Sequence, residues 1–207
     1  SFNELFGLSM DKAMEVRPSE KISSCSMCGT FRRRAIDLLA ESCGANVIAT
    51  GHNLDDYIQT FLINLFAGDV ERIGWTYPEP VEYGSSSLRK VKPLMEIYER
   101  EIVTYAIHTN IPFQTEECPY KDESIRSAFR RHLNNLEKIH PGIKYNAYNS
   151  ILKIARKVKS ANTSTINTTN VNNAIQQEHR RCLVCNRDSS NTVCSVCRTL
   201  NLLVKGN

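Results

Sequence analysis

Four cysteines near the end of the chain form the pattern with the clearest chemical meaning. They make two Cys-x2-Cys pairs separated by eight residues, at Cys182, Cys185, Cys194 and Cys197. Each two-residue spacer lets both sulfurs of a pair face one ion, and four thiolates suit tetrahedral Zn²⁺ at about 2.3 Å. Residues 181–207 are too few to fold on apolar burial alone, so bound metal must supply much of their stability. We predict a zinc knuckle, with a redox or iron site as the alternative.

A third Cys-x2-Cys pair, Cys25 and Cys28, stands at the start of a predicted helix. The first turn of a helix exposes backbone N–H groups and the positive end of the dipole, and both stabilise a thiolate. Three consecutive arginines, Arg32 to Arg34, act in the same direction. The pattern favours a nucleophilic or metal-bound sulfur, and half of another zinc site fits it equally well.

The segment Gly51-His52-Asn53-Leu54-Asp55-Asp56 lies where a predicted strand ends and a helix begins. Open α/β sheets bind nucleotides at such a place, and helix N-termini accept phosphate. Two carboxylates would repel a bare triphosphate, but they fit if Mg²⁺ intervenes or if one of them orients a reacting group. The alternative is an ordinary aspartate cap of a helix.

A single cysteine, Cys118, lies between two glutamates and a proline in a predicted loop. A lone cysteine in such a protein is usually a small apolar filler. The polar neighbours make that role unusual here, so Cys118 is a candidate functional thiol.

A basic helix is predicted from Glu123 to Lys138, with Arg126, Arg130 and Arg131 as its candidate RNA contacts. Arg126 and Arg130 are one turn apart and could follow a tRNA backbone. The alternative is a solvated helix face whose arginines pair with acids such as Glu123.

The elements that must hold these residues follow an α/β order. Besides the basic helix, hydrophobic periodicity and glycine or proline breaks predict helices over 30–43, 53–67, 96–109 and 143–158, strands over 46–50, 90–94 and 111–115, and an exposed loop over 77–87. Pro112 assigns the last strand to a sheet edge. The expected domains are 1–159, a polar linker over 160–180 and the knuckle over 181–207.

Composition supports a globular, cytoplasmic protein. The 207 residues are 41% hydrophobic with a formal charge of +4, which permits an anionic partner without requiring one. The sequence has no signal peptide and no long apolar run, so no membrane association is expected. In a reducing compartment, paired cysteines are metal ligands or redox thiols more often than disulfides.

Taken together, these motifs resemble one family. Its segments here are Cys-Ser-Met-Cys-Gly at 25–29, Ala-Thr-Gly-His-Asn-Leu-Asp-Asp at 49–56, Glu-Cys-Pro-Tyr at 117–120, the basic helix, Pro-Gly-Ile-Lys-Tyr-Asn at 141–146, and the knuckle. They occur in this order in the tRNA 2-thiouridine synthetases of archaea and some bacteria, a branch of the N-type ATP pyrophosphatases. The wobble-uridine thiolases of eukaryotes share most of them. The resemblance implies an incomplete Rossmann-like parallel sheet with flanking helices.

The resemblance also implies an activity, an ATP-dependent tRNA sulfurtransferase that makes 2-thiouridine. The family adenylates the C2 oxygen of a uridine, releases pyrophosphate and delivers sulfur to the activated carbon. Cys25, Cys28 and Cys118 match its sulfur-site cysteines. In many members these hold a [4Fe-4S] cluster with one iron free for sulfide. A persulfide on one cysteine is the other mechanism.

The remaining site residues follow from the same resemblance. Gly51 and Asp56 match positions near the nucleotide and the activated base. Gly51, His52, Asp55 and Asp56 are the expected cofactor-binding residues, and Asp56 is also expected to be catalytic. Arg32 stands where relatives carry a catalytic lysine, and a guanidinium keeps the charge but not the geometry of an ammonium. The expected cofactors are ATP, Mg²⁺, a [4Fe-4S] cluster and Zn²⁺. The expected partners are tRNA, a ubiquitin-like thiocarboxylated sulfur carrier or free sulfide, and a second copy in a homodimer.

The sequence departs from the family at its beginning. A Ser-Gly-Gly-x-Asp-Ser type pyrophosphate loop and an N-terminal zinc knuckle are both absent from the 207 residues. We therefore expect a fragment that does not adenylate by itself, and pyrophosphate release from ATP and tRNA tests this. The alternative functions are a non-catalytic zinc and RNA-binding module, or an inactive fragment. A lysidine or 2-thiocytidine enzyme is disfavoured by the knuckle and the Cys-Pro-Tyr loop.

Overall fold

The computed structural model describes residues 1–18, 22–78, 82–83, 86–120, 124–169, 181–187, 189 and 191–204. The chain divides into two compact units. The first comprises 1–48, 82–89 and 177–207, and the second comprises 49–81 and 90–176. Among the described helices, none combines the length and apolar character needed to cross a bilayer.

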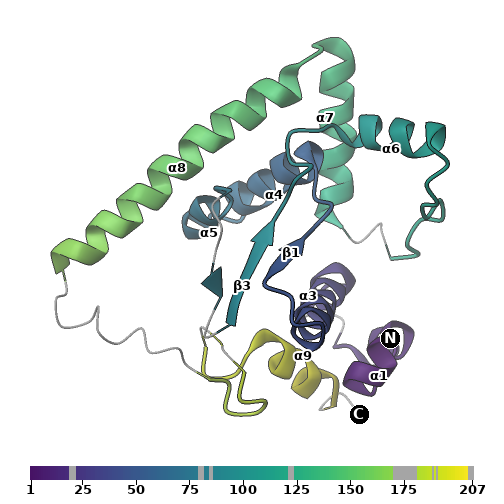
Figure 1. The fold of residues 1–207 in the computed structure, drawn as a ribbon, viewed down its shortest axis with the longest axis vertical. Coiled ribbons are helices and arrows are strands. Elements are labelled where there is room, and N and C mark those ends of the chain that lie inside the picture. Colours follow the sequence, from purple (N-terminus) through teal and green to yellow (C-terminus); the bar gives the residue numbers. More distant parts are fainter. Residues whose placement is uncertain are drawn as a thin grey trace. The chain divides into compact units, whose positions relative to one another are not determined.

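A small sheet supports the predicted nucleotide end of the fold, with strand order β1-β3-β2. Its strands are β1 (Val47–Ala49), β2 (Glu82–Tyr83) and β3 (Ser86–Val91). Arg89 N–H donates to the Asn46 carbonyl at 2.9 Å and Thr50 N–H to the Val91 carbonyl at 3.0 Å, so β1 and β3 run parallel (Figure 1). The β2 strand pairs antiparallel with β3. The predicted α/β class with a parallel sheet is confirmed.

The first unit is built around helix α3. Its helices are α1 (Phe2–Phe6), α2 (Met10–Val16), α3 (Ser24–Ser42) and α9 (Ser195–Val204). Met27 and Phe31, on one face of α3, are buried with Ala13 of α2 and with apolar groups of the cysteine-rich block. The Phe6 ring stacks on Phe31 with ring centroids 4.9 Å apart. The C-terminal block is therefore packed onto α3 rather than folded by itself.

The second unit is a helical layer with its own apolar core. Its helices are α4 (Leu54–Phe66), α5 (Val70–Trp75), α6 (Glu99–His108), α7 (Ile125–Ile139) and α8 (Ile143–Thr169). The core consists of Leu54, Tyr57, Ile58, Phe61, Ile73, Leu133, Tyr148 and Ile151. Helices α7 and α8 diverge from a shared turn at residues 140–142, and both pack against α4 (Figure 1).

Two predicted strands are wrong in place or in kind. The strand predicted over 90–94 lies at Ser86–Val91, and the predicted loop before it contains β2. Residues 111–115 form no strand. Ile111 and Phe113 are about half exposed, and Pro112 has no N–H to donate to a neighbouring strand. An apolar alternation without a pairing partner does not become a sheet edge.

The long helix α8 exceeds its prediction by eleven residues, since it ends at Thr169 instead of Val158. No glycine or proline interrupts residues 159–169, and their Asn, Ser and Thr side chains lower helix propensity without stopping a helix. The rest of the predicted linker, 170–180, lies outside the described residues. So does Glu123, at the predicted start of the basic helix, while α7 itself begins at Ile125.

Candidate functional site

The four C-terminal cysteines converge as the spacing predicts. The sulfurs of Cys182, Cys185, Cys194 and Cys197 all lie within 4.8 Å of one another. Sγ of Cys185 and Sγ of Cys194 are 3.8 Å apart. Two thiolates on one tetrahedral zinc, each about 2.3 Å from the metal, stand about 3.8 Å apart. The donor set therefore fits Zn²⁺ in both element and spacing.

Local backbone geometry shapes the first half of this cluster. After Cys182 the chain turns back, with Asn186 N–H donating to the Cys182 carbonyl and Cys182 N–H to the Arg187 carbonyl, each at 2.8 Å. Asn186 adopts φ 55°, a left-handed conformation that asparagine tolerates better than most residues. The turn directs Cys182 and Cys185 to the same side.

The electrostatics of the cluster differ from one sulfur to the next. Backbone N–H groups of Cys194 and Cys185 lower the pKa of Cys182 to about 6, and the Cys194 N–H lies 3.3 Å from Cys182 Sγ. Burial, followed by the neighbouring thiols, raises the pKa of Cys197. Four sulfurs this close can all be thiolates only if a cation lies among them, as Zn²⁺ would.

Two arginine contacts bind this cysteine cluster to α3. Arg34 of α3 donates to Cys194 Sγ at 3.6 Å. Arg187, two residues beyond Cys185, forms an ion pair with Glu41 at 2.6 Å. Sequence reasoning missed both contacts, because nothing in the local pattern links residues so distant along the chain.

The first cysteine pair lies at the start of α3, as predicted. Ser23 caps the helix, so Cys25 and Cys28 fall in its first two turns on a shared side. Cys25 is exposed and Cys28 is partly exposed, while Met27 between them is fully buried. Arg32 donates to Cys28 Sγ at 3.4 Å. The start of α3 therefore presents a solvent-accessible pair of sulfurs beside a positive charge.

The predicted nucleotide segment folds as a strand end followed by a capped helix. Asn53 and Asp56 form a reciprocal capping box at the start of α4, with Asp56 N–H donating to Asn53 Oδ1 at 3.0 Å. His52 is exposed, and its Nδ1 lies 2.8 Å from Thr50 Oγ1. Gly51 faces open space, where an added Cβ would meet nothing within 4 Å. The cap alternative is therefore present in the geometry, and it leaves the segment accessible.

Asp55 has a structural task in this unit. It is 2% exposed and forms a buried ion pair with Lys144, which is 4% exposed. Its second oxygen accepts the Glu99 N–H at 2.9 Å, and Lys144 also donates to Asn134 Oδ1 at 2.6 Å. The interaction joins the starts of α4, α6 and α8. Both oxygens of Asp55 already have partners within the fold. The nucleotide role of Asp55 remains a prediction.

Asp56 is the carboxylate left near solvent. Its Oδ1 lies 3.6 Å from Arg126 Nη1, and its side chain is 29% exposed. Lys92 lies close enough to Asp56 for the two charges to interact. Partial desolvation lowers the pKa of Lys92, although its side chain still reaches water, and attraction to Asp56 opposes that shift.

The three predicted RNA-contacting arginines differ in how fully they are engaged. Arg126 donates to the Asp56 carbonyl, to Gln59 Oε1 at 3.2 Å and to Thr60 Oγ1 at 3.0 Å, which anchors α7 to α4. Arg130 pairs with Glu99 at 2.8 Å. Arg131 is exposed, and no described residue forms an ion pair with it. Their contact with tRNA stays a prediction.

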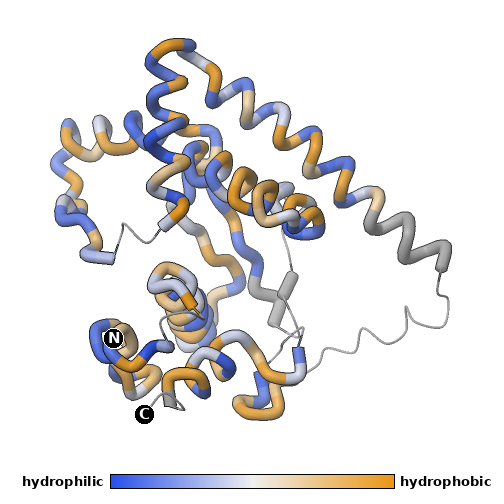
Figure 2. Tube along the Cα trace, turned by 180° about the vertical axis from the view of Figure 1, so that it is seen from behind, coloured by the Kyte–Doolittle hydropathy of each residue, from blue (hydrophilic) through white to orange (hydrophobic). Residues whose placement is uncertain are grey.

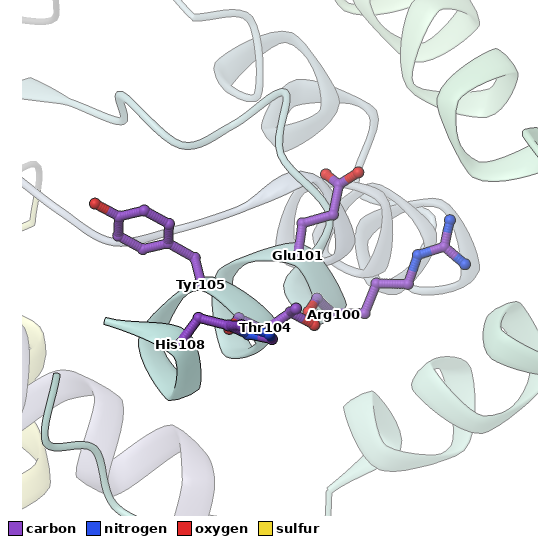
Figure 3. A pocket seen from close by; sticks show the side chains of 5 residues that line it. All are labelled: Arg100, Glu101, Thr104, Tyr105 and His108. Atoms are coloured by element: carbon purple, nitrogen blue, oxygen red, sulfur yellow. Dashed lines mark hydrogen bonds between the residues drawn. The ribbon is translucent and has the colours of Figure 1, made fainter. Parts of the chain in front are cut away.

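Cys118 is exposed in an irregular segment of the second unit, as expected of its loop. A shallow hollow elsewhere in this unit is lined by Arg100, Glu101, Thr104, Tyr105 and His108 of α6 (Figure 3). None of these five is a predicted site residue, and His108 Nδ1 is already 2.8 Å from the Thr104 carbonyl.

A family model described as a PP-loop domain matches residues 10–137. The chain belongs to the PP-loop family. The cytoplasmic tRNA 2-thiolation protein 1 of Saccharomyces cerevisiae is 32% identical over 205 residues, covering 99% of this chain and 55% of that protein. The tRNA 2-thiolation protein NcsA of Haloferax volcanii is 29% identical, covering 98% and 61%. The chain thus spans slightly over half the length of these relatives.

A solved structure extends the likeness of this PP-loop chain to three dimensions. The U34-tRNA thiolase NcsA of Methanococcus maripaludis, solved with its [4Fe-4S] cluster, superposes with a TM-score of 0.64 at 27% identity. The match covers 86% of this chain and 53% of that one. The suspected family is therefore confirmed on both sequence and fold.

Two residues of the PP-loop chain that matter at these sites escaped sequence reasoning. Lys144 lies on the same helix face as Tyr148, Ile151 and Ala155, at the spacing of a buried stripe, so its burial was readable from the pattern. Arg34 looked like one member of an arginine run, and its contact with Cys194 had no sequence signal.

Proposed function

We propose that this chain is part of an ATP-dependent tRNA 2-thiolation enzyme. The uridine C2 oxygen attacks the α-phosphorus of ATP and pyrophosphate leaves. Sulfur at the sulfide level then adds to C2, AMP departs carrying the former O2 oxygen, and the product is 2-thiouridine. The relatives' names and the PP-loop family support this assignment.

One observation carries the proposal further than the names do. The Cys25–Cys28 pair occupies the start of α3 with Arg32 directed at Cys28, in a chain that aligns over nearly all its length with tRNA 2-thiolation proteins. The four C-terminal thiols would fill all four positions of a tetrahedral metal, which is typical of a structural site and leaves no position open for chemistry. Sulfur handling falls to the exposed pair.

We assign Cys25 and Cys28, with Cys118 as a third thiolate, to a [4Fe-4S] cluster like that of the archaeal thiolase. A cluster with three protein ligands supplies one open iron for a sulfur atom. Arg32 contributes a positive charge beside Cys28, with its guanidinium 3.4 Å from Cys28 Sγ. Cys25 and Cys28 lie in the first unit and Cys118 lies in the second.

The nucleotide end of the site uses the start of α4. We propose that Asp56 holds Mg²⁺ or orients the reacting uridine, since it is the accessible carboxylate of the pair. Beside it, Gly51 leaves open space for a ligand and His52 offers an imidazole. Asp55, neutralised by Lys144, would fix the helix that presents them.

The partners follow from the same assignment. They are tRNA and a thiocarboxylated sulfur carrier or sulfide. Of the three arginines predicted to contact tRNA, Arg131 is the one for which no described residue forms an ion pair. The protein is expected in the cytoplasm, as the yeast relative's name says of that protein, and as a homodimer.

Mass spectrometry of tRNA nucleosides tests the function directly. A strain lacking the gene is complemented with wild type, with C25S/C28S and with C43S, and 2-thiouridine is measured. We expect 2-thiouridine with wild type and with C43S, because Cys43 is exposed and distant in sequence from the pair. C25S/C28S should abolish it. Undiminished 2-thiouridine in the deletion strain itself would leave only the zinc and RNA-binding module.

A further inference from the structure

The outer face of α8 carries an unusual excess of positive charge. Glu137 is the single acidic residue in the sequence from 125 to 169. Lys153, Arg156 and Lys157 are all exposed, and their spacing of three and four residues places them on neighbouring turns of one side. The opposite side of the helix is the buried one, with Tyr148 and Ile151. Hydrophilic and hydrophobic residues alternate along α8 accordingly (Figure 2).

Within the described part of the chain, these cations have no ion-pair partner. No described residue forms an ion pair with Lys153, Arg156 or Lys157. Glu137 cannot serve, because it is 6% exposed and its two oxygens accept the N–H groups of Gly142 and Lys144 at 2.7 and 3.0 Å. A solvated surface normally mixes charges of both signs. The segregation here indicates an anionic partner.

Aromatic rings lie beside the same helix. Gly74 of α5 packs so closely on α8 that an added Cβ would lie 3.3 Å from Val158 Cγ1. The next residue, Trp75, is 66% exposed. Lys159 Nζ stands 5.9 Å from the centroid of the Tyr77 ring. A large free indole therefore stands where α5 meets the basic helix.

We propose that the outer face of α8 and Trp75 bind a single-stranded stretch of RNA, the lysines and Arg156 contacting phosphates and Trp75 stacking on an unpaired base. This inference rests on the proposed function, which makes tRNA the RNA. Cationic grooves and exposed aromatic faces are the two components of single-strand recognition, because every base has a π-face and every nucleotide a charge. A membrane does not fit, since the apolar side of α8 is packed against α4 and α5.

The surface differs from the predicted RNA contact. Arg126 and Arg130 are engaged within the fold, whereas the cations of α8 have no described ion pair. The RNA surface therefore extends beyond the arginines of α7 that the sequence emphasised.

Fluorescence anisotropy with labelled tRNA, measured over a salt series, tests the surface. The variant K153E/K157E is compared with K12E/R89E, which changes the net charge equally at exposed positions of the first unit. We expect K153E/K157E to weaken binding roughly tenfold or more and to reduce the slope of log Kd against log salt by about 2. The control should change neither by a comparable amount.

A second variant separates stacking from charge. W75A should weaken binding about 5- to 150-fold while leaving the salt slope unchanged, as expected of a lost base–aromatic contact. Circular dichroism and zinc content verify that each variant is folded.

Several results would overturn the inference. One is wild-type affinity and slope in K153E/K157E; another is loss of affinity equal to that of the control. Competition by polyglutamate as strong as by RNA, with W75A unaffected, would instead identify an acidic protein partner. Absence of tRNA binding by the wild type would count against the proposed function itself, whereas failure of the α8 variants alone leaves thiolation intact.

Discussion

Two groups of acidic side chains in this protein have their negative charge balanced in different ways. In the second unit, the carboxylate of Asp55 is neutralised by Lys144 of the same chain. In the first unit, the cysteine cluster has backbone N–H groups and the Arg34 guanidinium, but its four sulfurs face one another. If the four cysteines bind Zn²⁺ as predicted, the first unit takes from a metal ion the charge that the second unit supplies from its own sequence.

The cysteine block and helix α3 share one apolar core. Met27 and Phe31 of α3 bury their apolar surface against the cysteine block, and α3 carries Cys25 and Cys28. The predicted metal in the knuckle would thus support the helix that presents the sulfur pair. The ion pair of the second unit needs no ion taken up from solution.

Removal of zinc should produce the largest effect. A C194S variant, or wild type treated with a strong chelator, should lose the fold of the knuckle, because structural zinc contributes on the order of 10 kcal/mol to such blocks. Hydrogen exchange measures this as lost protection in α9 and α3, with α4 and α8 still protected. C43S is the matched control. Retained protection of α9 without metal would break the comparison.

Removal of the internal cation should come next. K144M leaves the buried Asp55 carboxylate without its cation and should lower the free energy of unfolding by about 3–5 kcal/mol. The double variant D55N/K144M should recover part of this loss. Urea denaturation measures both, and K153M, at an exposed position, should stay within about 0.5 kcal/mol. An unchanged midpoint for K144M would show that the ion pair is not needed.

Glu137 gives a smaller effect that depends on pH. Burial opposes its ionisation, but the N–H groups of Lys144 and Gly142 outweigh it and lower the pKa of Glu137 below its ordinary 4.5. A carboxyl group whose pKa is lowered by folding stabilises the fold at pH above its pKa in the unfolded state. This stabilisation disappears as the pH falls through its pKa in the folded state. Wild type should exceed E137Q by about 1.5–3 kcal/mol at neutral pH.

The same measurement at acidic pH checks the sign. The difference between wild type and E137Q should shrink steadily below pH 4.5, the ordinary value for the group. A difference that grows on acidification would contradict the lowered pKa of Glu137.

The smallest effect is expected at the ion pair between the knuckle and α3. Arg187 and Glu41 are 35% and 41% exposed, so R187A should cost only about 0.2–1 kcal/mol of stability. Zinc release to a chromogenic chelator should accelerate slightly. A loss as large as that of K144M would remove the distinction between metal and ion pair.

The parts of the site that sequence predicted are those set by local spacing. The knuckle follows from two Cys-x2-Cys pairs, and the position of Cys25 and Cys28 from a helix start. The cap of α4 follows from Asn53 and Asp56 three residues apart. Each depends on residues within one or two turns, so no knowledge of packing is needed.

The parts that sequence missed depend on tertiary partners. Residues 111–115 have a strand-like pattern, but a strand requires a neighbour to pair with, and the sequence does not state whether one is available. Arg34 and Cys194 are 160 residues apart in the chain. The partners of Arg126 on α4 likewise have no signal in the sequence, and the contact of Arg126 with tRNA stays a prediction. Such contacts appear only when the elements are packed.

The most direct test of the account is the metal content of the protein purified without oxygen, measured with its visible absorption spectrum. Wild type should contain iron and zinc together. C25S/C28S should lose the iron and its visible absorption while keeping the zinc, and C182S should lose zinc. Iron retained in C25S/C28S, or iron bound by the four C-terminal cysteines, would contradict the division between a sulfur-handling pair and a structural knuckle.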